Sequence, residues 1–304
     1  MKNVLHAVKI LVRRNYDFSK WLYLQQLKRR DRHYPYGPLL VHQMGKVGST
    51  SVTDSLRVAD TGRPVYHVHF LADHLIRKYE QRRAVNLGTD REGRLRHVWQ
   101  SVHLRKQIDR GLTSGADWKV VSLVRDPVAR NLSNFFELLE VGTLGGGPRV
   151  VRSDEYGFEI PWTPDVGTKV IRLFFDLHDP LLADKFFERE IQGVYGVDVF
   201  EKQFDPAKGY QTYVGRGLEL LVIQMERLNH CFDAAIADFL GVEGAMLHSR
   251  NFASDKSYAE LYELVRAQIV FPDDYLKRVY GSRTAKHFYG SDDLARFRSK
   301  WQTE

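Results

Sequence analysis

A glycine-rich stretch with one lysine is the first feature of the sequence that could do chemistry. Residues 45–51 read GKVGSTS, between the apolar run 39–41 and a helical pattern. Gly45 and Gly48 let the backbone approach an anion closely, and the amides that open the next helix point at that anion. Lys46 adds a mobile positive charge. The lysine precedes the second glycine, whereas in the Walker A pattern it follows that glycine. The stretch predicts either a phosphate-binding loop or a simple tight turn.

A second candidate follows another apolar run. The segment 122–136 reads SLVRDPVARNLSNFF and places Arg125 where a buried strand should end, with Ser133 in the second turn of the next helix. Asp126 and Pro127 are typical of the start of that helix. Ligands of open α/β sheets bind at the carboxyl ends of the strands. Arg125 and Ser133 therefore predict a second phosphate clamp, unless Arg125 only pairs with a carboxylate.

Two histidines alternate along a short β-branched and aromatic segment. His67 and His69 lie in VYHVHFL, residues 65–71. The period of two in a strand puts both on one face. Histidine suits a general base near neutral pH. A structural pair is the alternative; a zinc site lacks support, because no Cys or further metal-spaced ligand is near in the sequence.

Together the two phosphate motifs resemble the sulfotransferase superfamily. Its members use 3′-phosphoadenosine 5′-phosphosulfate (PAPS) as donor and release 3′,5′-adenosine bisphosphate (PAP), and no metal is required. The shared patterns are strand–K-x-G-(S/T)-T and strand–R-D-P-x-x-R-x-x-S. The resemblance implies a 5′-phosphosulfate site and a 3′-phosphate site. The residues so assigned are Lys46, Gly48, Ser49, Thr50 and Ser51 at the 5′ site, and Arg125 and Ser133 at the 3′ site.

The carbohydrate-modifying branch of that superfamily offers the nearest resemblance. The uronyl 2-O-sulfotransferases carry a similar His-x-His ahead of Phe-Leu, which implies His69 as catalytic base, His67 as its support and Lys46 as stabiliser of the leaving group. The runs NFASDKSYAELY and KHFYG are similar to bacterial proteins described as putative capsular polysaccharide synthesis proteins. By position, Lys256 either reaches the 3′-phosphate or the acceptor, or begins a solvated helix.

Composition indicates a globular protein whose positive charge suits either an anionic ligand or simply a basic, soluble surface. The 304 residues are 43% hydrophobic and 12% aromatic, with a net charge of +7 and a pI near 9.3. Nucleic acid is not expected, since no recognised module or long Lys/Arg tract is present. The single Cys231 excludes an intrachain disulfide framework and a Cys-rich zinc site, which favours a reducing, cytoplasmic location.

The first 37 residues combine apolar residues with many Lys and Arg. We expect a helical N-terminal arm over 1–37, ended by YPYGP, and an α/β domain over 38–304. Charges interrupt the apolar residues too often for a secretory signal, and no run is long enough for a spanning helix. The arm is either a basic amphipathic helix in peripheral contact with an anionic membrane or a surface helix packed on the core.

Strands that alternate with helices predict a parallel sheet covered on both faces. The expected class is a three-layer α/β fold of the P-loop type, with a central parallel sheet and a helical C-terminal elaboration. The expected strands are 39–43, 64–70, 118–124 and 218–224, and the expected helices are 49–58, 74–110, 126–140 and 165–190. The stretch 142–148, GTLGGGP, is expected to be a flexible loop and a candidate lid, and the stretch before 217 to be rich in turns.

These motifs favour an enzyme that transfers a sulfuryl group from PAPS to a hydroxyl acceptor, with a carbohydrate as the expected acceptor. A P-loop kinase or other nucleotide phosphotransferase is the alternative enzyme. The position of Lys46 and the lack of a convincing acid for Mg²⁺ count against it. A non-catalytic nucleotide- or polyanion-binding protein is the third alternative.

Overall fold

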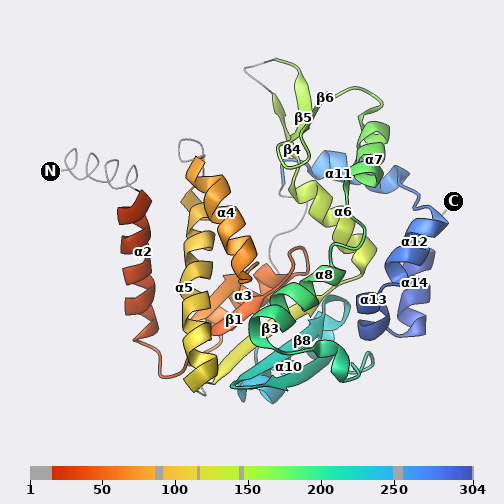
Figure 1. Ribbon diagram of the computed structural model, residues 1–304. Helices are drawn as coiled ribbons and strands as arrows, with labels where there is room; N and C mark the ends of the chain where they lie inside the picture. Colours follow the sequence, from red (N-terminus) through yellow and green to blue (C-terminus); the bar gives the residue numbers. More distant parts are fainter. Residues whose placement is uncertain (1–15, 86–91, 115–116, 144–146, 249–255, 303–304) are drawn as a thin grey trace.

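A five-stranded, mostly parallel sheet forms the centre of the molecule (Figure 1). The computed structural model describes residues 16–85, 92–114, 117–143, 147–248 and 256–302. The strand order is β2-β1-β3-β8-β7, and all neighbours are parallel except β7, which is antiparallel to β8. The strands are β1 (Leu39–His42), β2 (Val65–Val68), β3 (Trp118–Val124), β7 (Tyr210–Gly215) and β8 (Leu218–Gln224).

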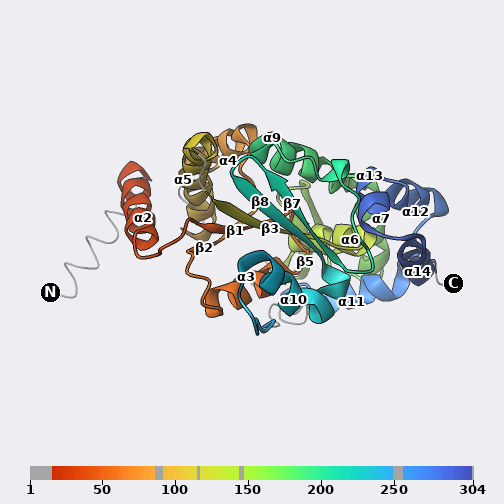
Figure 2. The same ribbon diagram turned by 90° about the horizontal axis from the view of Figure 1, so that it is seen from below.

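Helices cover both faces of this sheet (Figure 2), because its strands carry apolar residues on both sides. Val41 and its neighbours on that face pack against α3 (Ser49–Val58) and α10 (Leu228–Leu240). Leu40, one residue earlier, belongs to the core on the other face, which includes α5 (Glu92–Ser114). The predicted α/β fold with helices on both faces of the sheet is confirmed, whereas the sheet, predicted to be parallel, has one antiparallel strand, β7.

Strand β7 corrects the prediction of a turn-rich stretch before residue 217. Tyr210 and Tyr213 are buried, and Gly217 has a φ of 70°, which lets the chain reverse into β8. The β7–β8 pair is therefore an antiparallel hairpin at the edge of an otherwise parallel sheet. The two buried residues of β7 are three positions apart, so the sequence showed no strand-like alternation there.

A small antiparallel sheet lies on either side of the stretch 142–148, which was expected to be a loop. It has the order β4-β5-β6, with β4 (Glu140–Thr143), β5 (Arg149–Ser153) and β6 (Phe158–Pro161). Both flanks of the expected lid are thus paired strands, and residues 144–146 lie outside the described residues. The preceding helix, α6 (Pro127–Glu137), ends three residues earlier than expected to make room for β4.

Most other helices were longer in the prediction than in the structure. The stretch 74–110 is two helices rather than one, and the stretch 165–190 is broken after Leu177 by a turn that contains Pro180. The remaining helices are α2 (Tyr16–Asp31), α4 (Asp73–Val85), α7 (Val166–Leu177), α8 (Asp184–Phe186), the π-helical turn η1 (Phe187–Gln192), α9 (Gly193–Tyr195), the 3-10 turns η2 (Val199–Glu201) and η3 (Met225–Arg227), α11 (Ala259–Gln268), α12 (Asp273–Tyr280), α13 (Arg283–Phe288) and α14 (Ser291–Trp301). No helix within the described ranges is long and apolar enough to cross a membrane.

The parallel strands bring the sequence motifs to one edge of the sheet. His42 of β1 pairs with Val68 of β2, and Val124 of β3 pairs with Gln224 of β8, so these four strands end side by side. The segments that follow them therefore leave the sheet at the same edge. We call this the loop edge.

Candidate functional site

Residues 43–48, the lysine loop, connect β1 to α3 through an unusual backbone. Gly45, Lys46 and Gly48 have φ values of 83°, 62° and 81°. Lys46 is the only residue other than glycine with a positive φ in the described part of the chain, and such a conformation costs about 1–2 kcal/mol. The N-cap of α3 is Gly48, which has no side chain to satisfy the first amides of that helix. The loop thus places a helix start without an N-cap side chain beside a strained lysine.

Two arginines donate hydrogen bonds to backbone carbonyls of the lysine loop. Arg125, at the end of β3, donates from Nη1 to the carbonyl of Lys46 at 2.9 Å. Arg130, in α6, donates from Nη2 to the carbonyl of Met44 at 3.0 Å. Arg130 is buried, and its Nε has no partner among the described residues. Both guanidinium groups therefore bring positive charge to the loop. In these two contacts they donate to backbone carbonyls and not to a carboxylate.

One carboxylate receives two lysines at the rim of the loop. Glu137, the last residue of α6, lies 3.0 Å from Nζ of Lys46 and 3.8 Å from Nζ of Lys256. The hydroxyl of Tyr258 donates to the same carboxylate at 2.8 Å. Burial alone would raise the pKa of Glu137, but the charges of the lysines and the Tyr258 hydrogen bond lower it. Two cations from distant segments thus share one half-exposed anion.

The two histidines meet at the adjoining strand end. His67 lies in β2, and His69 lies just after it, with ring centroids 4.7 Å apart. Nε2 of Gln43 lies 3.1 Å from Nε2 of His67 and 2.8 Å from Nδ1 of His69. The hydroxyl of Ser49, at the start of α3, lies 2.9 Å from Nε2 of His67. The histidine segment and the lysine loop are therefore joined directly.

Gln43 contacts a ring nitrogen of each histidine and so determines which nitrogen of His69 carries the proton. The backbone N–H of Gly45 donates to Oε1 of Gln43, which turns the amide N–H groups toward the rings. Nδ1 of His69 then accepts from Gln43, so the proton of the neutral ring is on Nε2. A glutamine directly after an apolar strand gave no signal of this role in the sequence.

Both rings are neutral at pH 7. Burial, followed by the neighbouring His69 and His97, lowers the pKa of His67 to about 3. Burial, followed by His97 and His42, lowers the pKa of His69 to about 4. The residue His69 as a whole is nevertheless exposed to solvent, although protein atoms lie close around its imidazole. The neutral imidazole can accept a proton, but a pKa of about 4 makes it a weaker base than an ordinary histidine.

The buried carboxylate of Glu190 contacts two of the segments at the loop edge. Nε2 of His42, the last residue of β1, lies 3.2 Å from Oε2 of Glu190, and Nδ1 lies 2.9 Å from the hydroxyl of Tyr195. Oε2 of Glu190 also accepts from the backbone N–H groups of Leu71 and Ala72, at 2.6 and 3.0 Å. Glu190 thereby ties the end of β1 to the segment after His69, and π-helical turns such as η1 often mark functional sites. The sequence gave no sign of this link.

Asp126 and Glu226, two acidic residues that follow the ends of β3 and β8, accept hydrogen bonds that fix these segments. Asp126 caps α6 and accepts from the Tyr280 hydroxyl and the Trp301 indole, at 3.0 and 2.9 Å. Glu226 accepts from the backbone N–H of Asp126 at 2.6 Å and from the Tyr289 hydroxyl at 2.9 Å. Their carboxylates face the C-terminal helices, so they fix the strand end in position.

The remaining expected site residues lie near, without a role that the contacts define. Thr50 and Ser51 are in the first turn of α3, and Ser133 is half-buried in the second turn of α6. The structure therefore brings Lys46, Ser49, Arg125, Lys256 and both histidines into one set of contacts. In the described residues, no group of three His, Cys, Asp or Glu side chains could hold a metal ion.

The opposite edge of the sheet has a pocket of its own. It has a volume of about 440 Å³ and is lined by Tyr36, Arg63, Trp118 and residues near them. Nη2 of Arg63 lies 2.5 Å from the carboxylate of Asp117, and Nη1 donates to two backbone carbonyls. We call this the amino edge, because β1, β2 and β3 begin there.

One comparison with known proteins gives a match, in the C-terminal part of the chain. Residues 168–290 match the model of the NKWYS family, described as "putative capsular polysaccharide synthesis protein". No curated protein and no solved structure gives a match. The matched segment includes Glu190 and Lys256 but begins after the lysine loop, the histidines and Arg125. Over these residues the chain is similar to that family.

Proposed function

We propose that this protein is a sulfotransferase that moves a sulfuryl group from PAPS to a hydroxyl of a carbohydrate. The observation that carries the proposal is the sharing of Glu137 by Lys46 and Lys256, next to the histidine pair. Glu137 is close enough for its charge to act on the pKa of His69. An excess of cations and a neutral imidazole at one strand edge suit transfer from an anionic donor to a hydroxyl.

The loop edge fits an anionic donor in three ways. The first amides of α3 lack a capping side chain, the lysines share a single carboxylate, and Nε of Arg130 is buried without a partner among the described residues. We assign the lysine loop, with Ser49 to Ser51, to the 5′-phosphosulfate. Arg125 and Ser133, with Lys256, are assigned to the 3′-phosphate. The donor supplies a sulfur–oxygen bond whose cleavage releases PAP.

Charge stabilisation is the task of Lys46 in this proposal. As the bond to sulfur breaks, negative charge develops on the bridging oxygen, and a nearby ammonium lowers that barrier. In the structure the ammonium is held by Glu137, so an incoming anion competes with this carboxylate. Glu137 keeps the two lysines in place until then.

Proton transfer is the task of His69, supported by His67. The acceptor hydroxyl must lose its proton, and a neutral imidazole can take it. Because Gln43 occupies Nδ1 of His69, either this amide or the ring must turn before that nitrogen can accept. Ser49 and Gln43 keep His67 fixed beside it.

The fold and the family match agree with this proposal. We interpret the core as a three-layer fold of the P-loop type, with strand, lysine loop and helix in the expected order. The similarity to a capsular polysaccharide synthesis family favours a carbohydrate acceptor. The single Cys231, which is buried, suits a cytoplasmic enzyme.

The test is a transfer assay with two donors. Purified protein is given radiolabelled PAPS and a panel of glycans, lipids and phenols, without Mg²⁺. We expect label on a glycan, and about 100-fold less with Lys46→Ala, because a charge-stabilising group is lost. Transfer of a phosphoryl group from Mg-ATP to the same panel, with none from PAPS, would instead establish a phosphotransferase.

A further inference from the structure

Helix α2 turns an apolar face toward solvent. It stands at the outer side of the molecule, beside α5 (Figure 1). Phe18, Trp21 and Leu22 are 44%, 54% and 37% exposed, and their spacing places them on one face. The rings of Phe18 and Trp21 stack, with centroids 5.8 Å apart. Leu27, on the other face, is buried in the core.

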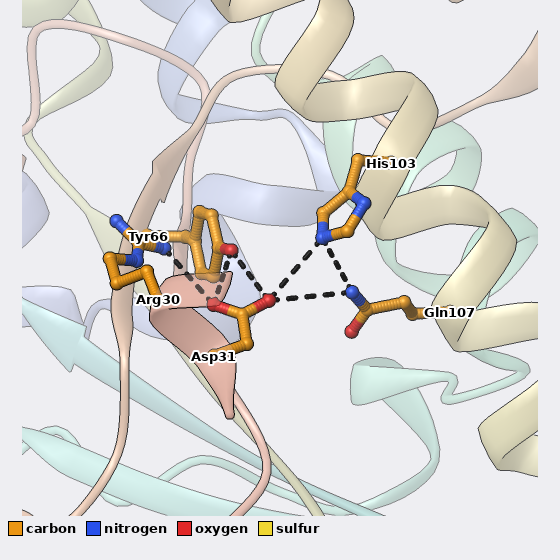
Figure 3. A network of polar contacts seen from close by, with 5 residues as sticks. All are labelled: Arg30, Asp31, Tyr66, His103 and Gln107. Atoms are coloured by element: carbon orange, nitrogen blue, oxygen red, sulfur yellow. Dashed lines mark hydrogen bonds and ion pairs between the residues drawn. The ribbon is translucent and has the colours of Figure 1, made fainter. Parts of the chain in front are cut away.

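A carboxylate network fastens the inner side of α2 (Figure 3). The hydroxyl of Tyr66 donates to both oxygens of Asp31, at 2.7 and 2.8 Å, and His103 lies 3.3 Å away. Gln107 donates to the same carboxylate at 3.4 Å, and the guanidinium of Arg30 lies over the Tyr66 ring. Burial alone would raise the pKa of Asp31, but the bonds from His103 and Tyr66 and the charge of Arg30 lower it. The end of the helix is therefore fixed to the core.

The same network accounts for His103, which lies in α5. His103 is buried and contacts Asp31, so it belongs to the attachment of α2. Near the other end of the helix, Lys20 pairs with Glu80 of α4 at 2.5 Å. Both contacts hold α2 so that its outer face stays uncovered by the described residues.

The net charge of the sequence lies in its first 37 residues. Residues 1–37 contain nine Lys and Arg and two acidic residues, whereas residues 38–304 contain 36 of each sign. The net charge of +7 therefore lies entirely in the N-terminal arm. On α2 itself, the exposed Lys28 and Arg29 follow Trp21 and Leu22 by seven residues, on the same face. Asp17, in the first turn, is the acidic exception.

We propose that the outer face of α2 docks on an anionic lipid surface. Trp and Phe side chains favour the boundary between headgroups and acyl chains, and Leu22 adds apolar area beside them. Lys28 and Arg29 meet anionic headgroups, as basic residues near a membrane surface do. None of the residues assigned to the donor site lies on α2, so the docking face is separate from that site.

Vesicle sedimentation tests the proposal with the full chain. Vesicles contain either phosphatidylcholine alone or phosphatidylcholine with phosphatidylglycerol. We expect binding to the anionic vesicles, with Trp21 emission shifted to the blue, and weakening by added salt. The triple variant Phe18→Ser, Trp21→Ser, Leu22→Ser should bind the anionic vesicles at least about tenfold more weakly than the wild type. The matched control is Val214→Ser with Met246→Ser, two exposed apolar residues elsewhere, and it should bind like the wild type.

A charge variant guards against a folding artefact. Lys28→Glu with Arg29→Glu keeps the apolar side chains and should also weaken vesicle binding by about tenfold, whereas Arg266→Glu with Lys286→Glu should not. Unchanged binding in both α2 variants would overturn the proposal. So would a wild-type dimer that ignores vesicles and becomes monomeric in the triple variant, because the face would then bind a second copy of the chain.

Discussion

The two edges of the central sheet differ in how their cationic side chains are paired. At the amino edge, Arg63 has Asp117 and two backbone carbonyls as partners, and it is buried. At the loop edge, Lys46 and Lys256 share the carboxylate of Glu137, and the backbone of Lys46 is strained. Strain and unmatched charge in a stable fold are usual where a ligand binds. A pocket alone, as at the amino edge, does not make a binding site.

The largest expected effect concerns the histidine pair at the loop edge. His69→Ala should lower kcat by about 100-fold or more while PAP affinity stays within twofold, because a general base is lost and the donor contacts remain. Initial rates with PAPS and calorimetry with PAP measure the two quantities. Equal kcat in the wild type and the variant would remove His69 from the reaction.

The pH profile sharpens the same prediction. The pKa of His69 is about 4, so the ring stays neutral well below its ordinary titration range. The kcat/KM of the wild type should therefore hold from pH 8 down to about pH 5 and fall only as the ring gains its proton. An acid limb near pH 6.5, the value of an unperturbed histidine, would contradict the assignment.

An intermediate effect is expected at the amino edge. Arg63→Ala removes a buried guanidinium with its ion pair to Asp117 and its hydrogen bonds to two backbone carbonyls, and it should lower the free energy of unfolding by about 1–3 kcal/mol. Its kcat with PAPS should not change, because the pocket there has no part in the reaction. Urea unfolding and the transfer assay measure the two properties. If Arg63→Ala unfolded like the wild type but had no transfer activity, the active site would have to be sought at the amino edge.

The smallest effect separates the backbone of Lys46 from its side chain. Lys46→Gly and Lys46→Ala both lose the ion pair, but only glycine is at ease with a φ of 62°. We expect the glycine variant to be at least as stable as the alanine variant. At Lys106, an exposed position in α5, alanine should be more stable than glycine by about 1 kcal/mol. The same order at both positions would mean that the loop is not strained.

Local features of the loop edge were predictable from the sequence, and long-range ones were not. Glycines after an apolar run and an Asp-Pro helix start depend on a few neighbouring residues, so the end of β3 was located correctly and that of β1 to within one residue. The pairing of Lys46 with Glu137 spans 91 residues, and that of Glu190 with Leu71 spans 119. No spacing rule reaches that far. Strand β7 was missed because its residues form a strand only beside β8.

Binding of PAP in Mg²⁺-free buffer tests the central claim most directly. Isothermal titration calorimetry compares the wild type with two arginine variants, one from each edge, below their unfolding temperatures. The account predicts equal affinity for the wild type and Arg63→Ala, and at least about tenfold weaker binding for Arg125→Ala, since a charged hydrogen bond to phosphate is lost. Undiminished affinity in Arg125→Ala, or binding only of ATP with Mg²⁺, would contradict it.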